Sequence, residues 1–144
     1  MPETRGLLEA ALYVEDMDRA VAFFAGVLGF RCMDAGSRLS AFDLGRSGVL
    51  LLCTRGASRT DLISDGGVIP GHDGFGPQHI AFAIEADGYA SWRAHLQSRG
   101  VMIRSEVVWP SGARSLYFED PDGHILEFAT VGVWPNSPGL SARW

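Results

Sequence analysis

The most informative run in the chain is RSLYFEDPDGHILEFAT, residues 114–130. Two runs rich in apolar residues, 114–119 and 125–130, flank the tetrapeptide Asp120-Pro121-Asp122-Gly123. This tetrapeptide is typical of a type I turn, in which Asp is favoured first, Pro second and Gly fourth. The run therefore predicts two consecutive strands joined by a tight turn.

Upstream of this run, the sequence predicts a strand over 79–85, a helix, and a strand over 102–108. Asp87 is a candidate N-cap for the helix, and Gly100 is its stop. Apolar side chains recur along the helix at i, i+3 and i+7, namely at Tyr89, Trp92 and Leu96. The second half of the chain is therefore expected to have the order β-α-β-β-β.

The first half repeats this order with a period of roughly seventy residues, which is longer than the period of solenoid repeats. Residues 7–14 predict a strand. Asp16 is the candidate N-cap of a helix that Gly29 stops, and Val21, Phe24 and Leu28 mark its apolar face. The remaining strands are expected over 30–33, 39–44 and 49–53.

The repeat predicts an α+β fold in which two βαβββ modules form one curved mixed sheet. We expect a single domain over 1–144, with modules over about 7–54 and about 78–131. Residues 55–77 are rich in Gly, Ser and Asp and are expected to form a long loop, which in a compact domain is usually functional or mobile. Residues 132–144 are expected to form an irregular C-terminal tail.

Composition excludes several classes of function. The 144 residues are 47% hydrophobic, which is enough for one core, and the formal net charge is −5 without a Lys/Arg cluster. Nucleic acid is therefore not an expected partner. A membrane is not expected either, because no apolar run approaches the ~20 residues that span a bilayer. We expect a cytosolic protein with two reduced cysteines, since residues 1–5 lack a signal-peptide pattern.

Strand alternation points to a metal site. Successive side chains of a strand point to opposite faces. In their three strands, Glu9, His79 and Glu127 therefore lie on the face opposite the bulky apolar residues, and an alanine lies two residues from each of them. Enclosed carboxylates are costly unless paired, and a divalent cation would remove that cost. Taken singly, each is more simply explained as a surface glutamate or a core histidine. Three at equivalent places in a repeat favour a ligand set.

The sequence resembles the vicinal-oxygen-chelate superfamily, which includes glyoxalase I, fosfomycin-resistance thiol transferases, extradiol dioxygenases and bleomycin-resistance proteins. The resemblance extends from Leu7 to about Trp134. It is carried by four runs: LEAALYVED (8–16), FF before VLGF (23–30), HIAF (79–82) and SLYFEDPDGHILE (115–127). It implies a glyoxalase-like fold and places the metal ligands on Glu9, His79 and Glu127. It also implies a homodimer with active sites at the interface, in which Glu9 of one chain joins the other two ligands from its partner.

The sequence departs from specific members of this family at several positions. A fourth ligand, present in glyoxalase I, would fall on Leu52 by counting from Gly48, which leaves three protein ligands. Glu9 replaces the first histidine of the extradiol dioxygenases, and ring cleavage is therefore not favoured. The hydroxyl and the lysine of fosfomycin thiol transferases fall on Ala11 and Val107, which disfavours thiol transfer.

Two functions remain open on the sequence. The first is a metal-dependent lyase or isomerase acting on a small substrate with vicinal oxygens, in which the ion (Mn²⁺, Fe²⁺, Co²⁺, Ni²⁺ or Zn²⁺) stabilises an enolate or oxyanion and Glu127 is the candidate proton shuttle. The second is a non-catalytic protein that sequesters a drug, like the bleomycin-resistance group. The candidate substrate-binding residues around the last hairpin are Trp109, Ser111, Arg114 and Tyr117.

Overall fold

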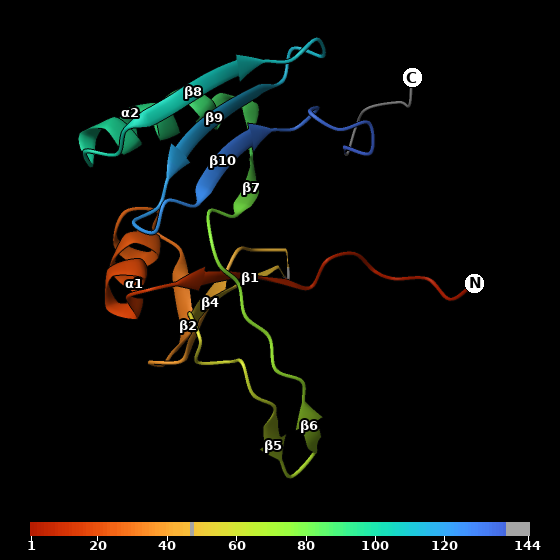
Figure 1. The fold of residues 1–144 in the computed structure, drawn as a ribbon. Helices are drawn as coiled ribbons and strands as arrows, with labels where there is room; N and C mark the ends of the chain where they lie inside the picture. The colour runs from red at the N-terminus through yellow and green to blue at the C-terminus, as the bar shows by residue number, and fades with distance from the viewer. Residues whose placement is uncertain (47, 138–144) are drawn as a thin grey trace. The chain divides into compact units, whose positions relative to one another are not determined.

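The first half of the chain follows the predicted order of elements. In the computed structural model, which describes residues 1–46 and 48–137, the chain divides into two compact units, Met1–Gly76 and Pro77–Trp144. The first unit contains β1 (Glu9–Val14), α1 (Met17–Gly26), β2 (Arg31–Ala35), β3 (Leu39–Asp43) and β4 (Val49–Thr54) (Figure 1). Its sheet order is β1-β4-β3-β2, and β1 runs parallel to β4.

The second unit repeats this topology. It contains β7 (His79–Ile84), the 3-10 helix η1 (Ala86–Gly88), α2 (Tyr89–Ser98), β8 (Ile103–Val108), β9 (Arg114–Glu119) and β10 (Ile125–Thr130). Its sheet order is β7-β10-β9-β8, with β7 parallel to β10 (Figure 1). The predicted α+β fold with two βαβββ modules is confirmed, and strand pairing within each module gives that module its own four-stranded mixed sheet.

Both helices cover the bulky face of their own sheet. In the first unit, Phe24 of α1 packs on Phe42 with ring centroids 6.0 Å apart. In the second, Trp92 of α2 packs on Phe128 at 4.3 Å, and Phe128 also contacts Phe118 at 5.1 Å. Burying one such side chain is worth about 1.5–3 kcal/mol. The face opposite the helix therefore carries Glu9 in the first sheet and carries His79 and Glu127 in the second, as strand alternation predicts.

The two helices begin differently. Asp16 caps α1 as predicted, because its Oδ1 accepts a hydrogen bond from the backbone N–H of Arg19 at 3.0 Å. The prediction that Asp87 caps α2 is wrong. Asp87 lies inside η1, and Gly88 occupies the N-cap position without a side-chain hydrogen bond. The chain thus enters α2 through a tight 3-10 turn that satisfies its own backbone groups.

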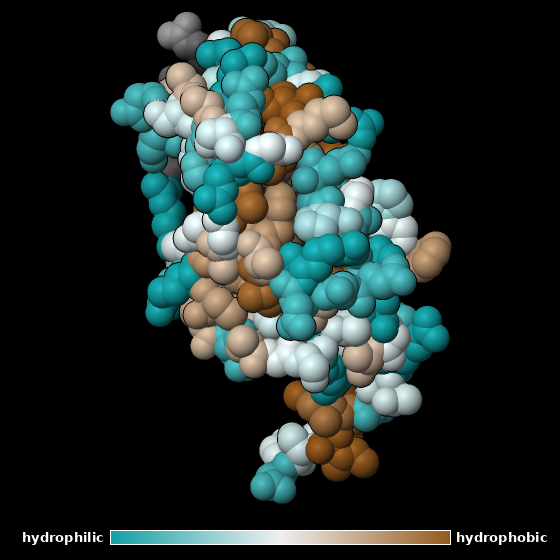
Figure 2. All heavy atoms as spheres, turned by 90° about the vertical axis from the view of Figure 1, so that its left-hand side faces the viewer, coloured by the Kyte–Doolittle hydropathy of each residue, from teal (hydrophilic) through white to brown (hydrophobic). Residues whose placement is uncertain are grey.

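The expectation that residues 55–77 form a long loop is wrong in part. This segment, nearly all of which belongs to the first unit, contains an antiparallel hairpin of β5 (Leu62–Ser64) and β6 (Gly67–Ile69), which Asp65 and Gly66 join. An Asp-Gly pair between two short apolar runs is a strong signal of a β-hairpin, and the prediction of a loop from the Gly, Ser and Asp content overlooked it. The apolar side chains of this hairpin are exposed and form the brown group at the bottom of Figure 2: Leu62 41%, Ile63 81%, Val68 59% and Ile69 52%.

The C-terminal residues 132–137 form turns and bends, and the rest of the predicted irregular tail, 138–144, lies outside the described residues. No helix in residues 1–46 and 48–137 has the length and hydropathy needed to cross a bilayer.

Candidate metal site

His79 and Glu127 lie together on the open face of the second sheet. Their strands are neighbours, and the register pairs Ile125 with His79 and Ala81 with Glu127. Nε2 of His79 is 3.3 Å from Oε2 of Glu127. The Glu127 side chain is only 7% exposed, whereas that of His79 is 53% exposed. A nearly buried carboxylate therefore faces an imidazole that solvent can reach.

A second contact fixes the orientation of the His79 ring. Nδ1 of His79 lies 2.9 Å from the carbonyl oxygen of Ile125. A carbonyl oxygen only accepts hydrogen bonds, so Nδ1 carries a proton and donates to Ile125. Nε2 is then the ring nitrogen that faces the Glu127 carboxylate, at 3.3 Å. A protonated ring donates to that carboxylate, and a neutral ring with this tautomer leaves Nε2 able to bind a cation together with it. A carbonyl partner on the other ring nitrogen is typical of metal-binding histidines.

Tyr117 completes the polar group on this face. It lies opposite Glu127 in the β9–β10 register, and its ring centroid is 6.2 Å from that of His79. Burial raises the pKa of Tyr117, and the nearby charge of Glu127 raises it further. Both effects favour the neutral phenol. Tyr117, predicted as a substrate-binding residue, therefore lies beside a predicted metal ligand on the same face of the sheet.

Ser115 is a member of this group that sequence reasoning missed. It is fully buried and lies on the same face of β9 as Tyr117. Nε1 of Trp109 donates to Oγ of Ser115 at 2.7 Å, which links a second predicted pocket residue to the site. Alternation along β9 was the available signal, since Ser115 and Tyr117 are two residues apart.

The other two predicted pocket residues lie elsewhere. Oγ of Ser111 accepts a hydrogen bond from the backbone N–H of Ala113 at 3.3 Å within the turn before β9. Arg114 lies on the helix-covered face, with its guanidinium 3.8 Å from the ring centroid of Tyr89 and its Nη2 atom 3.9 Å from Glu106. The structure therefore does not bring Arg114 together with His79, Tyr117 and Glu127.

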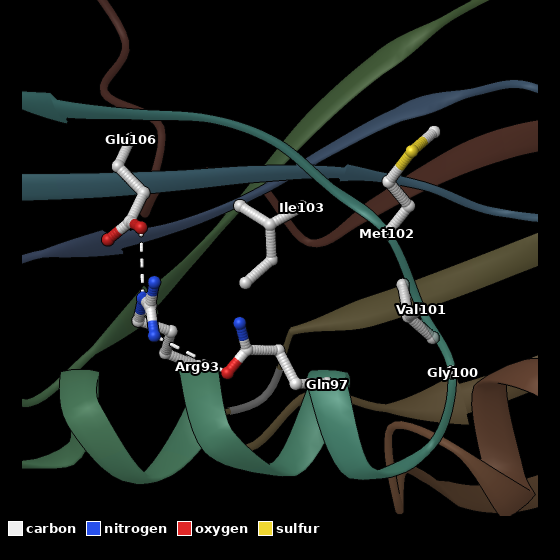
Figure 3. A pocket seen from close by; sticks show the side chains of 7 residues that line it. All are labelled: Arg93, Gln97, Gly100, Val101, Met102, Ile103 and Glu106. Atoms are coloured by element: carbon white, nitrogen blue, oxygen red, sulfur yellow. Dashed lines mark hydrogen bonds and ion pairs between the residues drawn. The ribbon is translucent and has the colours of Figure 1, made fainter.

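A surface groove of about 530 Å³ lies on the side of the second unit that bears α2 (Figure 3). Its charged groups already bind one another, since Nε of Arg93 donates to Glu106 at 2.9 Å and Nη1 donates to Gln97 at 3.3 Å. Glu106 pairs with Leu116 in the β8–β9 register, on the face opposite Tyr117. This groove is separate from the candidate metal site.

Glu9 begins β1 in the first unit and is exposed. The register gives it the same place in its module as His79, because Glu9 pairs with Val49 just as His79 pairs with Ile125. Within residues 1–46 and 48–137, no group of three His, Cys, Asp or Glu side chains converges as a metal site. Each unit therefore supplies part of the predicted ligand set.

The position equivalent to Glu127 in the first module is Leu51, not Leu52. Leu51 pairs with Ala11 exactly where Glu127 pairs with Ala81. Leu52 is fully buried and belongs to the helix-covered face. The count from Gly48 was wrong by one residue, but an apolar side chain occupies either position. The first module therefore offers Glu9 alone on this face where the second offers His79 and Glu127.

Comparison with known proteins identifies the family of this chain. The family model described as the Glyoxalase/Bleomycin resistance protein/Dioxygenase superfamily matches residues 6–128. The sequence is 28% identical over 122 residues to the metallothiol transferase FosB of Lysinibacillus sphaericus, covering 81% of this chain and 76% of that protein. It is also 28% identical over 131 residues to the lactoylglutathione lyase of Haemophilus influenzae, covering 85% of this chain and 90% of that protein.

Solved structures share the fold. The crystal structure of lactoylglutathione lyase from Agrobacterium tumefaciens matches with a TM-score of 0.83 and 26% identity, covering 92% of this chain and 98% of that chain. The fosfomycin resistance protein FosX from Listeria monocytogenes matches with a TM-score of 0.66 and 21% identity, covering 91% and 97%. The second likeness is one of fold alone.

Proposed function

We propose that this chain, which belongs to the Glyoxalase/Bleomycin resistance protein/Dioxygenase superfamily, is a metal-dependent lyase or isomerase acting on a small molecule with vicinal oxygens. The single observation that carries the proposal is the His79–Glu127 pair, in which Nε2 of the imidazole lies 3.3 Å from a nearly buried carboxylate while a backbone carbonyl group holds Nδ1. A crevice that only sequesters a drug has no need of such a pair.

The donor set fits a divalent cation. One imidazole nitrogen and two carboxylates, from His79, Glu127 and Glu9, suit Mn²⁺, Fe²⁺, Co²⁺, Ni²⁺ or Zn²⁺. When bound, such an ion supplies a Lewis acid that stabilises negative charge developing on a substrate oxygen. The alanines at positions 11, 81 and 129 leave room beside the ligands for that substrate, because a methyl group is the largest side chain they present.

The residues of the chain have separate tasks in this proposal. His79 presents Nε2 because the Ile125 carbonyl group holds its other nitrogen. Glu127 is the proton shuttle, taking a proton from substrate at a carboxylate oxygen and returning it to a neighbouring atom. Tyr117 lies opposite Glu127 on the neighbouring strand and presents its hydroxyl group on the same face of the sheet, where substrate would bind. The low exposure of Glu127 keeps bulk water from competing for the same proton.

We further propose a cytosolic homodimer whose sites contain Glu9 from one chain and His79 and Glu127 from its partner. The two free cysteines, Cys32 and Cys53, are consistent with a reducing compartment. Glu9 lies in the first unit and the other two candidate ligands lie in the second, so a complete set requires a first unit and a second unit together, and the proposal takes them from different chains. Thiol transfer is the competing reaction, given the similarity to metallothiol transferases.

Metal analysis tests the proposal. Protein purified without a His-tag or chelators should hold close to one divalent ion per chain, and Glu9→Ala, His79→Ala and Glu127→Ala should each lose it. Matched controls are Glu106→Gln and His95→Ala, whose side chains lie on the helix side of the second unit and should not affect metal content. Wild-type protein that takes up no divalent ion, yet binds an aromatic drug tightly, would overturn the enzyme proposal.

Mixing two inactive variants tests the shared site. If each site takes Glu9 from one chain and the other ligands from its partner, Glu9→Ala and Glu127→Ala homodimers are both defective. A mixed dimer of the two variants then contains one intact site and one doubly altered site, so unfolding and refolding them together should restore part of the metal binding. Sites built within single chains would show no restoration, and a monomer in sedimentation velocity would contradict the dimer.

A further inference from the structure

The face of the first sheet that carries Glu9 is covered at one end. Glu9, Ala11 and Tyr13 share this face of β1, and Glu9 is exposed, whereas Ala11 and Tyr13 are half-buried. Tyr13 pairs in the parallel register with Cys53, which lies on the same face of β4 and is 0% exposed. On the face opposite the helix, a side chain is buried only where another segment lies over it. The face is therefore open at Glu9 and closed at Tyr13 and Cys53.

The covering segment is residues 71–74, which we call the strap. Nδ1 of His72 lies 2.7 Å from the Tyr13 hydroxyl oxygen, and the two rings meet edge to face with their centroids 5.8 Å apart. The backbone of Gly74 packs so closely on Tyr13 that a side chain at this position would collide with the Tyr13 ring. Both the backbone and a side chain of the strap therefore rest on Tyr13.

Asp73 anchors the strap on its other side. Its Oδ1 atom accepts a hydrogen bond from the backbone N–H of Gly56 at 3.0 Å, and its Oδ2 atom accepts one from Nε of Arg59 at 2.6 Å. Both donors follow β4 in the chain, and all of these residues belong to the first unit. A segment held by Tyr13 on one side and by two donors on the other is a fixed wall at the end of this face.

The distance from Glu9 to this wall is short. A strand rises about 3.3 Å per residue, so the Cα atoms of Glu9 and Tyr13 are about 13 Å apart and those of Glu9 and Ala11 about 7 Å apart. The strap occupies the Tyr13 ring, and Ala11 is the residue of this face that lies between Glu9 and Tyr13. A molecule whose oxygens lie beside Glu9 and whose chain runs along β1 therefore meets the strap after about 7–10 Å.

We infer that the strap sets the length of substrate that the Glu9 face accepts, and that His72 and Asp73 determine this specificity by holding the strap in place. The inference rests on the proposed metal function and narrows its substrate to short molecules with vicinal oxygens. A longer chain would have to displace the strap and break the hydrogen bonds that hold it. A fixed obstacle of this kind discriminates between ligands by excluding the longer one.

Two hydroxamates that differ only in length test the inference. Acetohydroxamate and octanohydroxamate present the same pair of vicinal oxygens to a metal ion, and only the second carries an alkyl chain long enough, about 9 Å, to reach the strap. In the Zn²⁺-loaded protein, the released variant His72→Ala/Asp73→Ala should bind octanohydroxamate about tenfold more tightly than wild type does, and acetohydroxamate within about twofold of wild type. Isothermal titration calorimetry measures both affinities.

The ratio of the two affinities separates a change in reach from damage to the metal site, because such damage would weaken both ligands. The matched control is His95→Ala/Asp65→Ala, which removes the same two types of side chain at exposed positions in α2 and in the hairpin turn. Its affinity ratio should equal that of wild type. Thermal unfolding in EDTA verifies that each variant is folded.

The reactivity of Cys53 reports the cover without metal. The chain has two cysteines, so Cys32→Ala leaves Cys53 as its single thiol. In EDTA and in this background, the thiol reagent DTNB should react with Cys53 about tenfold faster in the released variant than in the protein with an intact strap. The control variant should react at the rate of the intact protein.

The outcomes separate this inference from the proposed function. Wild-type protein that binds neither Zn²⁺ nor acetohydroxamate, with Cys53 still made reactive by release, overturns the proposed function and leaves the strap as the cover of this face. Zn²⁺-loaded wild type whose affinity ratio equals that of the released variant overturns the inference alone. Equal reactivity of Cys53 with and without the two anchors also overturns it, because the strap would then not close the end of the face.

Discussion

The Tyr13 hydroxyl group and Nδ1 of His72 lie 2.7 Å apart, so the segment after the β5–β6 hairpin is tied to the face of β1 that carries Glu9. The attachment is extensive, because the backbone N–H of His72 also donates to the Ser58 carbonyl group at 2.7 Å. His72 is exposed and still takes part in this attachment. Residues 71–74 are therefore a fixed part of the first unit.

Asp73 should stabilise this attachment in a pH-dependent way. Backbone hydrogen bonding from Gly56, followed by the Arg59 guanidinium at 2.6 Å, lowers the pKa of Asp73 to about 2. A depressed carboxyl pKa stabilises the fold above the unfolded-state value near 3.8, and that stability is lost as the pH falls toward 2. Asp73→Asn should therefore unfold at a lower temperature than wild type at pH 7, and the difference should shrink below about pH 4.

Thermal unfolding between pH 7 and pH 3 measures this effect. Asp65→Asn, in the exposed turn of the hairpin, is the control that removes a carboxylate without touching Arg59 or Gly56. A gap between wild type and Asp73→Asn that is constant across this pH range would show that the carboxylate charge is not responsible.

Gly74 is the closest approach of this segment to β1. A Cβ atom added to Gly74 would lie 2.3 Å from Cδ2 of Tyr13, whose hydroxyl group is already held by His72. Gly74→Ala should therefore reduce the free energy of unfolding by about 1–3 kcal/mol in urea titration. Gly26→Ala is the control, since nothing lies within 4 Å of its added Cβ atom at the end of α1. Equal stability of the two variants would refute this steric argument.

The three tyrosines should ionise later in the folded protein than in the unfolded chain. Burial raises the pKa of Tyr13 and Tyr117, and burial followed by the hydrogen bond to Glu106 raises that of Tyr89 to about 12. A raised phenol pKa stabilises the fold fully below the unfolded value of 10.0, and this stability is lost as the pH rises through the folded value.

Absorbance of phenolate at 295 nm measures this titration. The native curve should lie at higher pH than the curve in denaturant, and Tyr89→Phe should remove the component that titrates near 12. Coincident native and denatured curves would mean that the phenols are not shielded as described.

Phe128 should be among the most costly residues to truncate. It is 1% exposed and contacts the rings of Trp92 and Phe118 between α2 and the second sheet. Phe128→Ala should lower the free energy of unfolding by about 3–5 kcal/mol in EDTA, where metal makes no contribution. Phe75→Ala, at a ring that is 93% exposed, should change it by less than about 0.5 kcal/mol. A small loss at Phe128 would place the core of this unit elsewhere.

Local patterns in the sequence were sufficient to predict the two modules and to bring one pair of candidate ligands to the same face of a sheet. The turn at Asp120–Gly123 and the alternation along β7 and β10 bring His79 and Glu127 to one face, and both depend only on neighbouring residues. The same alternation, applied to β9, separates Arg114 from Tyr117, so the placement of Arg114 on the helix side was also available from the sequence.

Other features depend on contacts that a linear pattern does not contain. Gly48 directly precedes β4, whereas Gly123 lies two residues before β10, so counting from these glycines misplaced the position equivalent to Glu127. The hydrogen bond from Trp109 to Ser115 requires the turn before β9 to fold back on the sheet. The proposed meeting of Glu9 with His79 and Glu127 depends on the assembly of two chains, which no local preference in the sequence specifies.

The matched registers of the two modules make Leu51 a latent coordination position. Leu51 follows Val49, the partner of Glu9, by two residues. Glu127 follows Ile125, the partner of His79, by the same two residues, so Leu51 and Glu127 occupy equivalent places. A protein engineer who introduces Leu51→Glu would give the first half the same two-donor geometry as the second. This substitution would therefore add a fourth protein donor to the proposed three-donor centre while keeping the existing strand register.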